Sequence, residues 1–216
     1  DSAYTVYKLF ASRIKQNTMM SYDRMTYDDV APIDFRYKTI DPKIFEELVA
    51  SAPSVLDFHD FSKNWACEPC EAARPVHLFE NSLISLVSET LFETNGKSSL
   101  FYSEKTFKPI LYNHPIMIFG QPGLNTTLGT VGFKTYNSYF DLTFDLIEDH
   151  VARLDAQVKQ LEILNDRLLS ITVNQRIDWL LQDRETLEYN KHALRAQVFN
   201  KKKLNELIEL VKAQVE

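Results

Sequence analysis

Glycine and proline are confined to one part of this 216-residue chain, and their distribution constrains the fold more than any other feature. All five glycines lie within residues 96–132, all eight prolines lie within residues 32–122, and the last 84 residues contain neither. Glycine and proline mark chain reversals and interrupt helices. We therefore expect a turn-rich front domain over residues 1–141 and a long helical tail over residues 142–216.

The front is predicted to alternate helices with strands. Asp41 and Pro42 form an N-cap followed by a proline at the first helical position, and Ser103 is expected to cap a later helix. Helices are expected over residues 4–15 and 42–51, and strands over residues 54–58, 83–87 and 114–119. Strand, helix and strand in this order predict a βαβ unit in a parallel sheet. The fold class is therefore α/β.

The tail carries apolar residues at alternating steps of four and three from Ile147 to Leu168. This spacing predicts one helix of about 25 residues with a narrow apolar stripe. Two further helical patterns follow, around residues 177–198 and 204–211. Because such a stripe exposes apolar surface unless something covers it, we expect the tail to hold a partner, most simply a second copy of the chain. An intramolecular helical hairpin is the alternative.

Composition excludes several classes of protein. The net charge of −6 weighs against tight, sequence-independent binding to nucleic acid. The scarcity of glycine excludes multi-glycine phosphate loops, so any phosphate site must use a helix N-terminus with basic side chains. No apolar run reaches the roughly 18 residues that span a membrane, and no signal peptide is recognisable. We expect a soluble intracellular protein, and a chain that begins with Asp1 is interpreted as a processed or trimmed fragment.

The segment Ser103-Glu104-Lys105 could carry chemistry at the start of a helix. Free N–H groups there carry partial positive charge, Lys105 could neutralise a diphosphate, and Glu104 could accept hydrogen bonds from a ribose diol. Ordinary helix capping would select the same residue types. The residues themselves leave both interpretations open.

Longer motifs surround this segment. They lie at residues 83–90, 101–110, 114–118, 132–136 and 141–145. Together they resemble the donor-binding half of glycosyltransferases of the GT-B type, above all those encoded by phages and large viruses. A more distant likeness is to α-1,3-fucosyltransferases, in which Phe-Glu-Asn-Ser, here ending at Asn81-Ser82, is followed by Glu-Lys, here Glu104-Lys105.

The resemblance implies a Rossmann-like domain and a nucleotide-sugar donor. It places Glu104 on the ribose, Lys105 on the phosphates beside Ser103, and Asn81 near the donor. An early arginine usually helps to hold the diphosphate in such relatives, and Lys8 stands at the matching place. Residues 132–136 are expected to be a strand that closes the domain.

The implied activity is metal-independent transfer of a sugar from the nucleotide-sugar co-substrate, with no other cofactor and no Asp-x-Asp metal motif. The acceptor stays open between a modified DNA base, a surface glycan and a protein, and a phage-encoded enzyme would act in the host cytoplasm. GT-B enzymes work between two such domains, whereas this chain has room for one. The chain is therefore expected to be a fragment, to be completed by another subunit, or to have lost catalysis. The alternative function is that of a non-catalytic interaction protein that works through its helical tail.

Trp65 to Cys70 contains a second constellation, with Cys67 and Cys70 spaced as in the redox motif of thioredoxins. A thioredoxin-like redox protein is therefore another alternative, and a zinc site is less favoured because one such pair supplies only two ligands. His114 is expected at a strand entry near the donor site. The aromatic residues between Tyr136 and Phe144 are expected to pack between front and tail.

Overall fold

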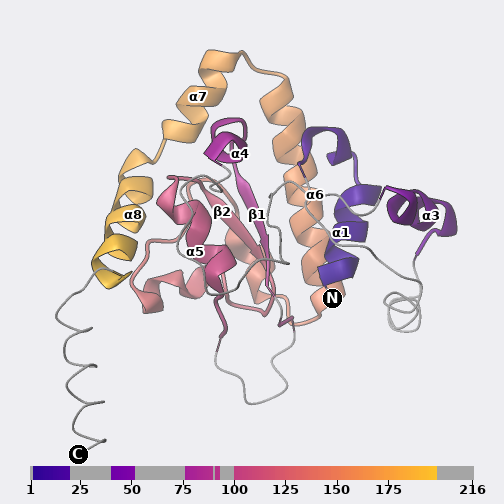
Figure 1. Cartoon of the computed structure of the whole chain (residues 1–216), viewed down its shortest axis with the longest axis horizontal. Coiled ribbons are helices and arrows are strands. Elements are labelled where there is room, and N and C mark those ends of the chain that lie inside the picture. Colours follow the sequence, from indigo (N-terminus) through magenta and orange to yellow (C-terminus); the bar gives the residue numbers. More distant parts are fainter. Residues whose placement is uncertain (1, 20–39, 52–75, 90, 93–99, 199–216) are drawn as a thin grey trace, which may run out of the picture.

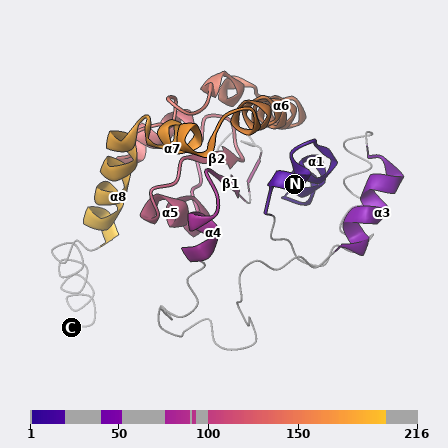
Figure 2. The ribbon, with the colours of Figure 1, turned by 90° about the horizontal axis from the view of Figure 1, so that it is seen from above.

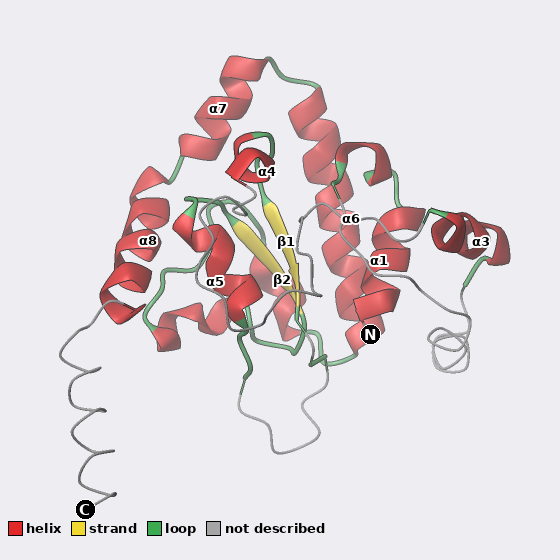
Figure 3. Cartoon of the chain, viewed as in Figure 1, coloured by secondary structure: helices red, strands yellow, loops and turns green. Residues whose placement is uncertain are grey.

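The computed structural model describes residues 2–19, 40–51, 76–89, 91–92 and 100–198. These residues form helices around one pair of strands (Figures 1 and 3). In chain order the elements are α1 (Ser2–Ala11), η1 (Lys15–Asn17), α3 (Pro42–Ala50), α4 (Val76–Glu80), β1 (Ser85–Ser88), α5 (Glu104–Leu111), β2 (Ile116–Phe119), η3 (Thr126–Val131), η4 (Leu142–Leu146), α6 (His150–Leu169), α7 (Val173–Leu181) and α8 (Arg184–Val198). The predicted strand at 54–58, the pattern at 204–211, Cys67 and Cys70 lie outside the described residues.

The predicted βαβ unit is confirmed in its elements. β1 pairs in parallel with β2, with Ser85 opposite Ile116 and Ser88 opposite Phe119, and α5 connects them. All four residues of β2 are buried, as expected for a parallel strand covered on both faces. Figure 2 shows α5 and α6 on different sides of the strand pair. The described chain is thus α/β at a coarse level, with helix predominating.

The outer edge of β2 is closed by side chains. The Asn125 amide accepts a hydrogen bond from the backbone N–H of Ile118 at 2.8 Å and donates to the carbonyl of the same residue at 2.9 Å. Gln157 of α6 donates to that carbonyl as well, at 2.9 Å. Asp145 holds Asn125 in place by accepting from its amide at 2.9 Å. Because both polar groups of Ile118 are satisfied, no further strand is needed at this position.

The predicted strand over residues 132–136 is wrong. Gly132 ends η3 in a left-handed conformation with φ of 91°, and the following residues are irregular. Tyr136 is buried, and Phe133 packs on Phe107 of α5 with ring centroids 5.7 Å apart. The apolar residues of this segment therefore serve the core as loop side chains, while the edge of β2 that a strand would have joined is taken by Asn125 and Gln157.

Two predicted helix starts are confirmed. Asp41 accepts a hydrogen bond from Lys43 N at 2.8 Å, and Ser103 accepts one from Lys105 N at 3.3 Å. Helix α1 ends at Ala11 and η1 follows, so the helix predicted over residues 4–15 is shorter.

The tail begins later than its pattern suggests, because Ile147 follows η4 and α6 starts at His150. The pattern around residues 177–198 forms two helices, α7 and α8.

One hydrophobic core joins both predicted domains. It contains Tyr4 of α1, Ile118 of β2, Leu161 of α6 and Leu187 of α8. The aromatic residues between Tyr136 and Phe144 are buried in it, as predicted. The division at residue 141 stays a prediction about domains, but the residues on its two sides share a single core.

Candidate functional site

The carboxyl ends of β1 and β2 lie at the same edge of the strand pair because the strands are parallel. Helix α5 begins at this edge, since it must run back to the start of β2. In open α/β sheets this edge is where ligands bind. We call it the carboxyl edge and define it by the described residues that surround it: Glu89, Leu91, Phe101, Ser103, Lys105 and Gln121.

A buried carboxylate stabilises the start of α5. Oε1 of Glu89, the residue directly after β1, accepts hydrogen bonds from Ser103 N at 2.9 Å and from Thr106 Oγ1 at 2.6 Å. Negative charge at a helix N-terminus is favourable because the unpaired N–H groups there carry partial positive charge. Sequence reasoning missed Glu89. The available signal was an acidic residue directly after a strand, where the carboxyl edge of a parallel pair lies.

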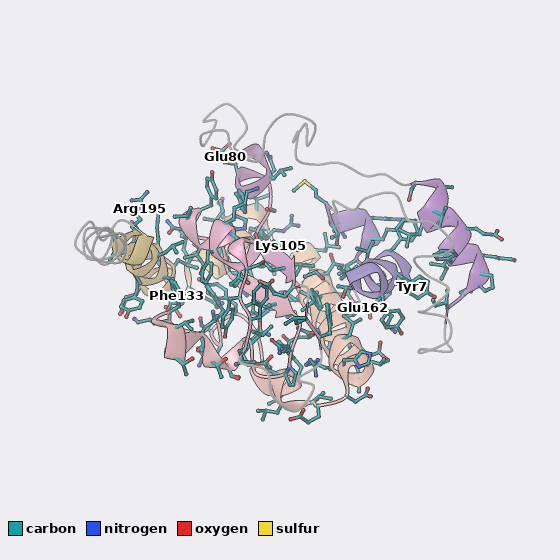
Figure 4. The ribbon with its side chains drawn as sticks, turned by 60° about the horizontal axis from the view of Figure 1, so that its bottom comes forward. Tyr7, Glu80, Lys105, Phe133, Glu162 and Arg195 are labelled. Atoms are coloured by element: carbon teal, nitrogen blue, oxygen red, sulfur yellow. The ribbon has the colours of Figure 1, made fainter. Side chains whose placement is uncertain are left out.

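Lys105 is exposed in the first turn of α5 (Figure 4). A cation at this end of a helix adds to the positive potential of the N–H groups, so it contributes nothing favourable to the helix itself. Its position favours an anion from outside the chain. Glu104 is the first residue of α5, but its side chain is not among those that the structure describes. The role of Glu104 on a ribose stays a prediction.

Two apolar side chains of the segments that follow β1 and precede α5 are exposed. Phe101 is 44% exposed and Leu91 is 43% exposed. The backbone of Phe101 is held in place by its N–H, which donates to Oε1 of the buried Gln121 at 3.0 Å. An exposed aromatic ring held by an ordered backbone is a surface on which a flat ring can stack.

Two residues predicted for the site lie elsewhere. Asn81 follows α4 and precedes β1, so it lies at the amino end of the strand, opposite the carboxyl edge. A residue before a parallel strand and a helix start after it occupy different edges, so Asn81 does not lie at the edge of Ser103 and Lys105, and its role near the donor stays a prediction. Lys8 of α1 forms an ion pair with Asp155 of α6. The structure thus brings together Ser103 and Lys105, but neither Asn81 nor Lys8 contacts them in the described interactions.

His114 lies at the entry of β2, as predicted, and thus at the amino edge of the strand pair; its expected nearness to the donor site stays a prediction. Its Nε2 is 2.7 Å from the carbonyl of Phe79, which can only accept, so Nε2 carries the proton. Nδ1 then accepts from Ser85 Oγ at 3.0 Å. Burial lowers the pKa of His114, and the hydrogen bond to the carbonyl opposes this shift. The residue is a satisfied, neutral histidine that joins the two strands to α4.

Arg153 of α6 is the buried cation behind the carboxyl edge, with 2% of its surface exposed. Nε and Nη2 donate to Gly120 O, Nη2 also donates to Phe92 O at 2.9 Å, and Nη1 donates to the carbonyls of Ile147 and Glu148. Burial lowers the pKa of this guanidinium, against the attraction of nearby carboxylates. All five of its N–H groups are used. Arg153 therefore supports the edge and has no donor left for a diphosphate.

The apolar stripe of α6 is buried within the chain itself. Leu154 and Leu161 are each 3% exposed, and α6 lies beside α1 (Figure 1). The stripe is therefore not the surface of a homodimer, because the chain's own core covers it. Val173, Ile177 and Leu181 of α7 are exposed instead, at helical spacing. Self-association stays a prediction, and α7 offers one exposed apolar face for it.

Among the described residues, no group of three or more His, Cys, Asp or Glu side chains is placed to hold a metal ion. No helix in the same ranges has the length and apolarity to cross a membrane. Comparison of the chain with models of protein families, with curated proteins and with solved structures finds no match. The resemblance to glycosyltransferases thus rests on the sequence motifs.

Proposed function

We propose that this chain binds a nucleotide sugar at the carboxyl edge and acts as a glycosyltransferase of the GT-B type or as the donor-binding half of one. The observation that carries the proposal is the position of Lys105, exposed in the first turn of a helix that starts at the ligand-binding edge of a parallel βαβ unit. The motif resemblance of residues 101–110 supports the same assignment.

The chemistry follows from these groups. A diphosphate would lie against the ammonium group of Lys105 at the positive end of the α5 dipole, which together offset its negative charge as the bond to the sugar breaks. The exposed ring of Phe101 would stack on the base. Ser103 caps the helix and keeps its first turn ordered. No catalytic base is assigned, and the acceptor stays open between a modified DNA base, a glycan and a protein.

Calorimetric titration with a panel of nucleoside diphosphates and nucleotide sugars tests the proposal. We expect one of them to bind, and Lys105→Ala to weaken binding by about 1.5 to 3 kcal/mol, the usual contribution of a hydrogen bond to a charged group. Lys159→Ala, which removes an exposed lysine on α6, is the matched control and should leave affinity unchanged. Absence of heat with every donor, or equal loss in both variants, would contradict the proposal.

A further inference from the structure

The two oxygens of the Glu89 carboxylate are satisfied unequally. Oε1 accepts from Ser103 N and from Thr106 Oγ1, whereas Oε2 is buried and has no hydrogen-bond partner among the described residues. The residue as a whole is 0% exposed. A buried carboxylate oxygen without a hydrogen-bond donor destabilises the fold, because it has lost its hydrogen bonds to water and has gained none from the protein. Such an oxygen indicates a place for a donor group from outside the chain.

The position of Glu89 between the two strand ends and α5 is fixed by close packing. A Cβ atom at Gly120, the residue after β2, would lie 3.2 Å from Glu89 Cβ and 3.2 Å from the carbonyl of Leu91. The absent side chain of Gly120 thus allows the end of β2 to approach Glu89. The carboxylate consequently belongs to the same edge as Ser103 and Lys105, since it bonds the cap residue of α5 directly.

We infer that Oε2 of Glu89 accepts a hydrogen bond from a hydroxyl group of the nucleotide sugar. The inference rests on the proposed function and adds a contact to it. A diphosphate would be repelled by this carboxylate, so the phosphates lie on the side of Lys105 and a hydroxyl-bearing part lies on the side of Glu89. Hydroxyls donate short, strong hydrogen bonds to carboxylates. The ribose and the transferred sugar both carry such groups.

The experiment compares the wild-type chain with Glu89→Gln. The probes are whichever of ADP, GDP, CDP and UDP binds best, its 2′-deoxy and 3′-deoxy analogues, and the corresponding nucleoside diphosphate glucose. Glu188→Gln, which changes a carboxylate on α8, is the matched control. We expect Glu89→Gln to weaken binding of the glucose conjugate about tenfold and Glu188→Gln to leave it unchanged.

The analogues distinguish the two hydroxyl sources. If a ribose hydroxyl donates the hydrogen bond to Glu89, a deoxy analogue binds the wild type about tenfold more weakly than the parent nucleotide does. The same analogue and its parent then bind Glu89→Gln with equal affinity. If a hydroxyl of the transferred sugar donates the hydrogen bond, the nucleoside diphosphate binds the wild type and Glu89→Gln equally. Only its glucose conjugate then binds Glu89→Gln more weakly. Unchanged affinity of Glu89→Gln for every probe overturns the inference.

Should Glu89→Gln fail to fold, the wild type still decides, with deoxy-glucose conjugates added to the analogues. Equal affinity for all deoxy compounds and their parents overturns the inference without the variant. If no nucleotide binds the wild type, the proposed function fails as well. If binding depends on Lys105 and not on Glu89, the inference alone fails.

Discussion

Replacement of Arg153 should destabilise the chain more than any surface substitution on the same helix. Arg153→Met keeps the length and apolar stem of the side chain and removes the guanidinium that donates to the carbonyls of Phe92, Gly120, Ile147 and Glu148. These carbonyls come from three separate segments, which the guanidinium therefore holds together.

The magnitude follows from the groups left behind. The bonds to the carbonyls of Phe92 and Gly120 are buried, and a buried carbonyl that loses its donor costs about 1 to 3 kcal/mol. The bonds to the carbonyls of Ile147 and Glu148 are partly buried, so water can replace part of what these two lose. The cost of burying the charge is recovered when the guanidinium is removed, which offsets part of the loss. We expect a net loss of about 3 kcal/mol in the free energy of unfolding, or a fall in Tm of roughly 6 to 12 °C for a chain of this size.

Urea and thermal unfolding followed by circular dichroism measure this difference. Arg167→Met is the control, because Arg167 is exposed near the end of the same helix and its loss should cost less than about 0.5 kcal/mol. Arg153→Lys should give an intermediate loss, since an ammonium has three donors and cannot span four carbonyls. A loss below about 1 kcal/mol for Arg153→Met would refute the argument that these bonds hold the edge together.

Three further outcomes are expected. Gly120→Ala should lower stability by about 1 to 3 kcal/mol in thermal unfolding, because its Cβ would lie 2.6 Å from a buried leucine methyl, whereas Gly129→Ala, with nothing within 4 Å, should be nearly neutral. The pKa of His114 is held below its ordinary 6.5 in the folded chain, so the unfolded chain binds the proton more readily. The contribution of His114 to the free energy of unfolding should therefore be complete above about pH 6.5 and decrease as the pH falls. His114→Gln should flatten this dependence in unfolding curves between pH 7 and 5; an unchanged slope would contradict the assignment. Leu161→Ala should lower the free energy of unfolding by about 2 to 5 kcal/mol, whereas Ile163→Ala, at a 60% exposed position, should change it little. Similar losses in the two variants would mean that the apolar stripe of α6 is not buried in the monomer.

Local signals predicted the elements that depend on local chemistry. The caps at Asp41 and Ser103 were readable because their side chains bond N–H groups two residues on. The strands at residues 85–88 and 116–119 were readable as short apolar runs, and the order strand, helix, strand predicted that they are parallel. The helix start that carries Lys105 was readable from its cap residue, Ser103.

The errors concern contacts between residues distant in sequence. Residues 132–136 look like a strand in isolation, and nothing local shows that Asn125 and Gln157 occupy the edge they would join. Asn81 was placed near the donor from a four-residue likeness, and such a likeness does not show at which edge of the strand pair the residue lies. The stripe of α6 was taken as a surface because its partner, α1, lies about 150 positions earlier in the chain.

The tail is part of what shapes the candidate site. Arg153 and Gln157, both on α6, bond the carbonyls of Gly120 and Ile118 and so fix the end of β2 from behind. Gly120 in turn must stay close to Glu89, the carboxylate that holds the start of α5. A chain cut at residue 141 would therefore lose these supports along with its last helices. We expect nucleotide binding, where it occurs, to require α6, although α6 contributes no residue to the carboxyl edge.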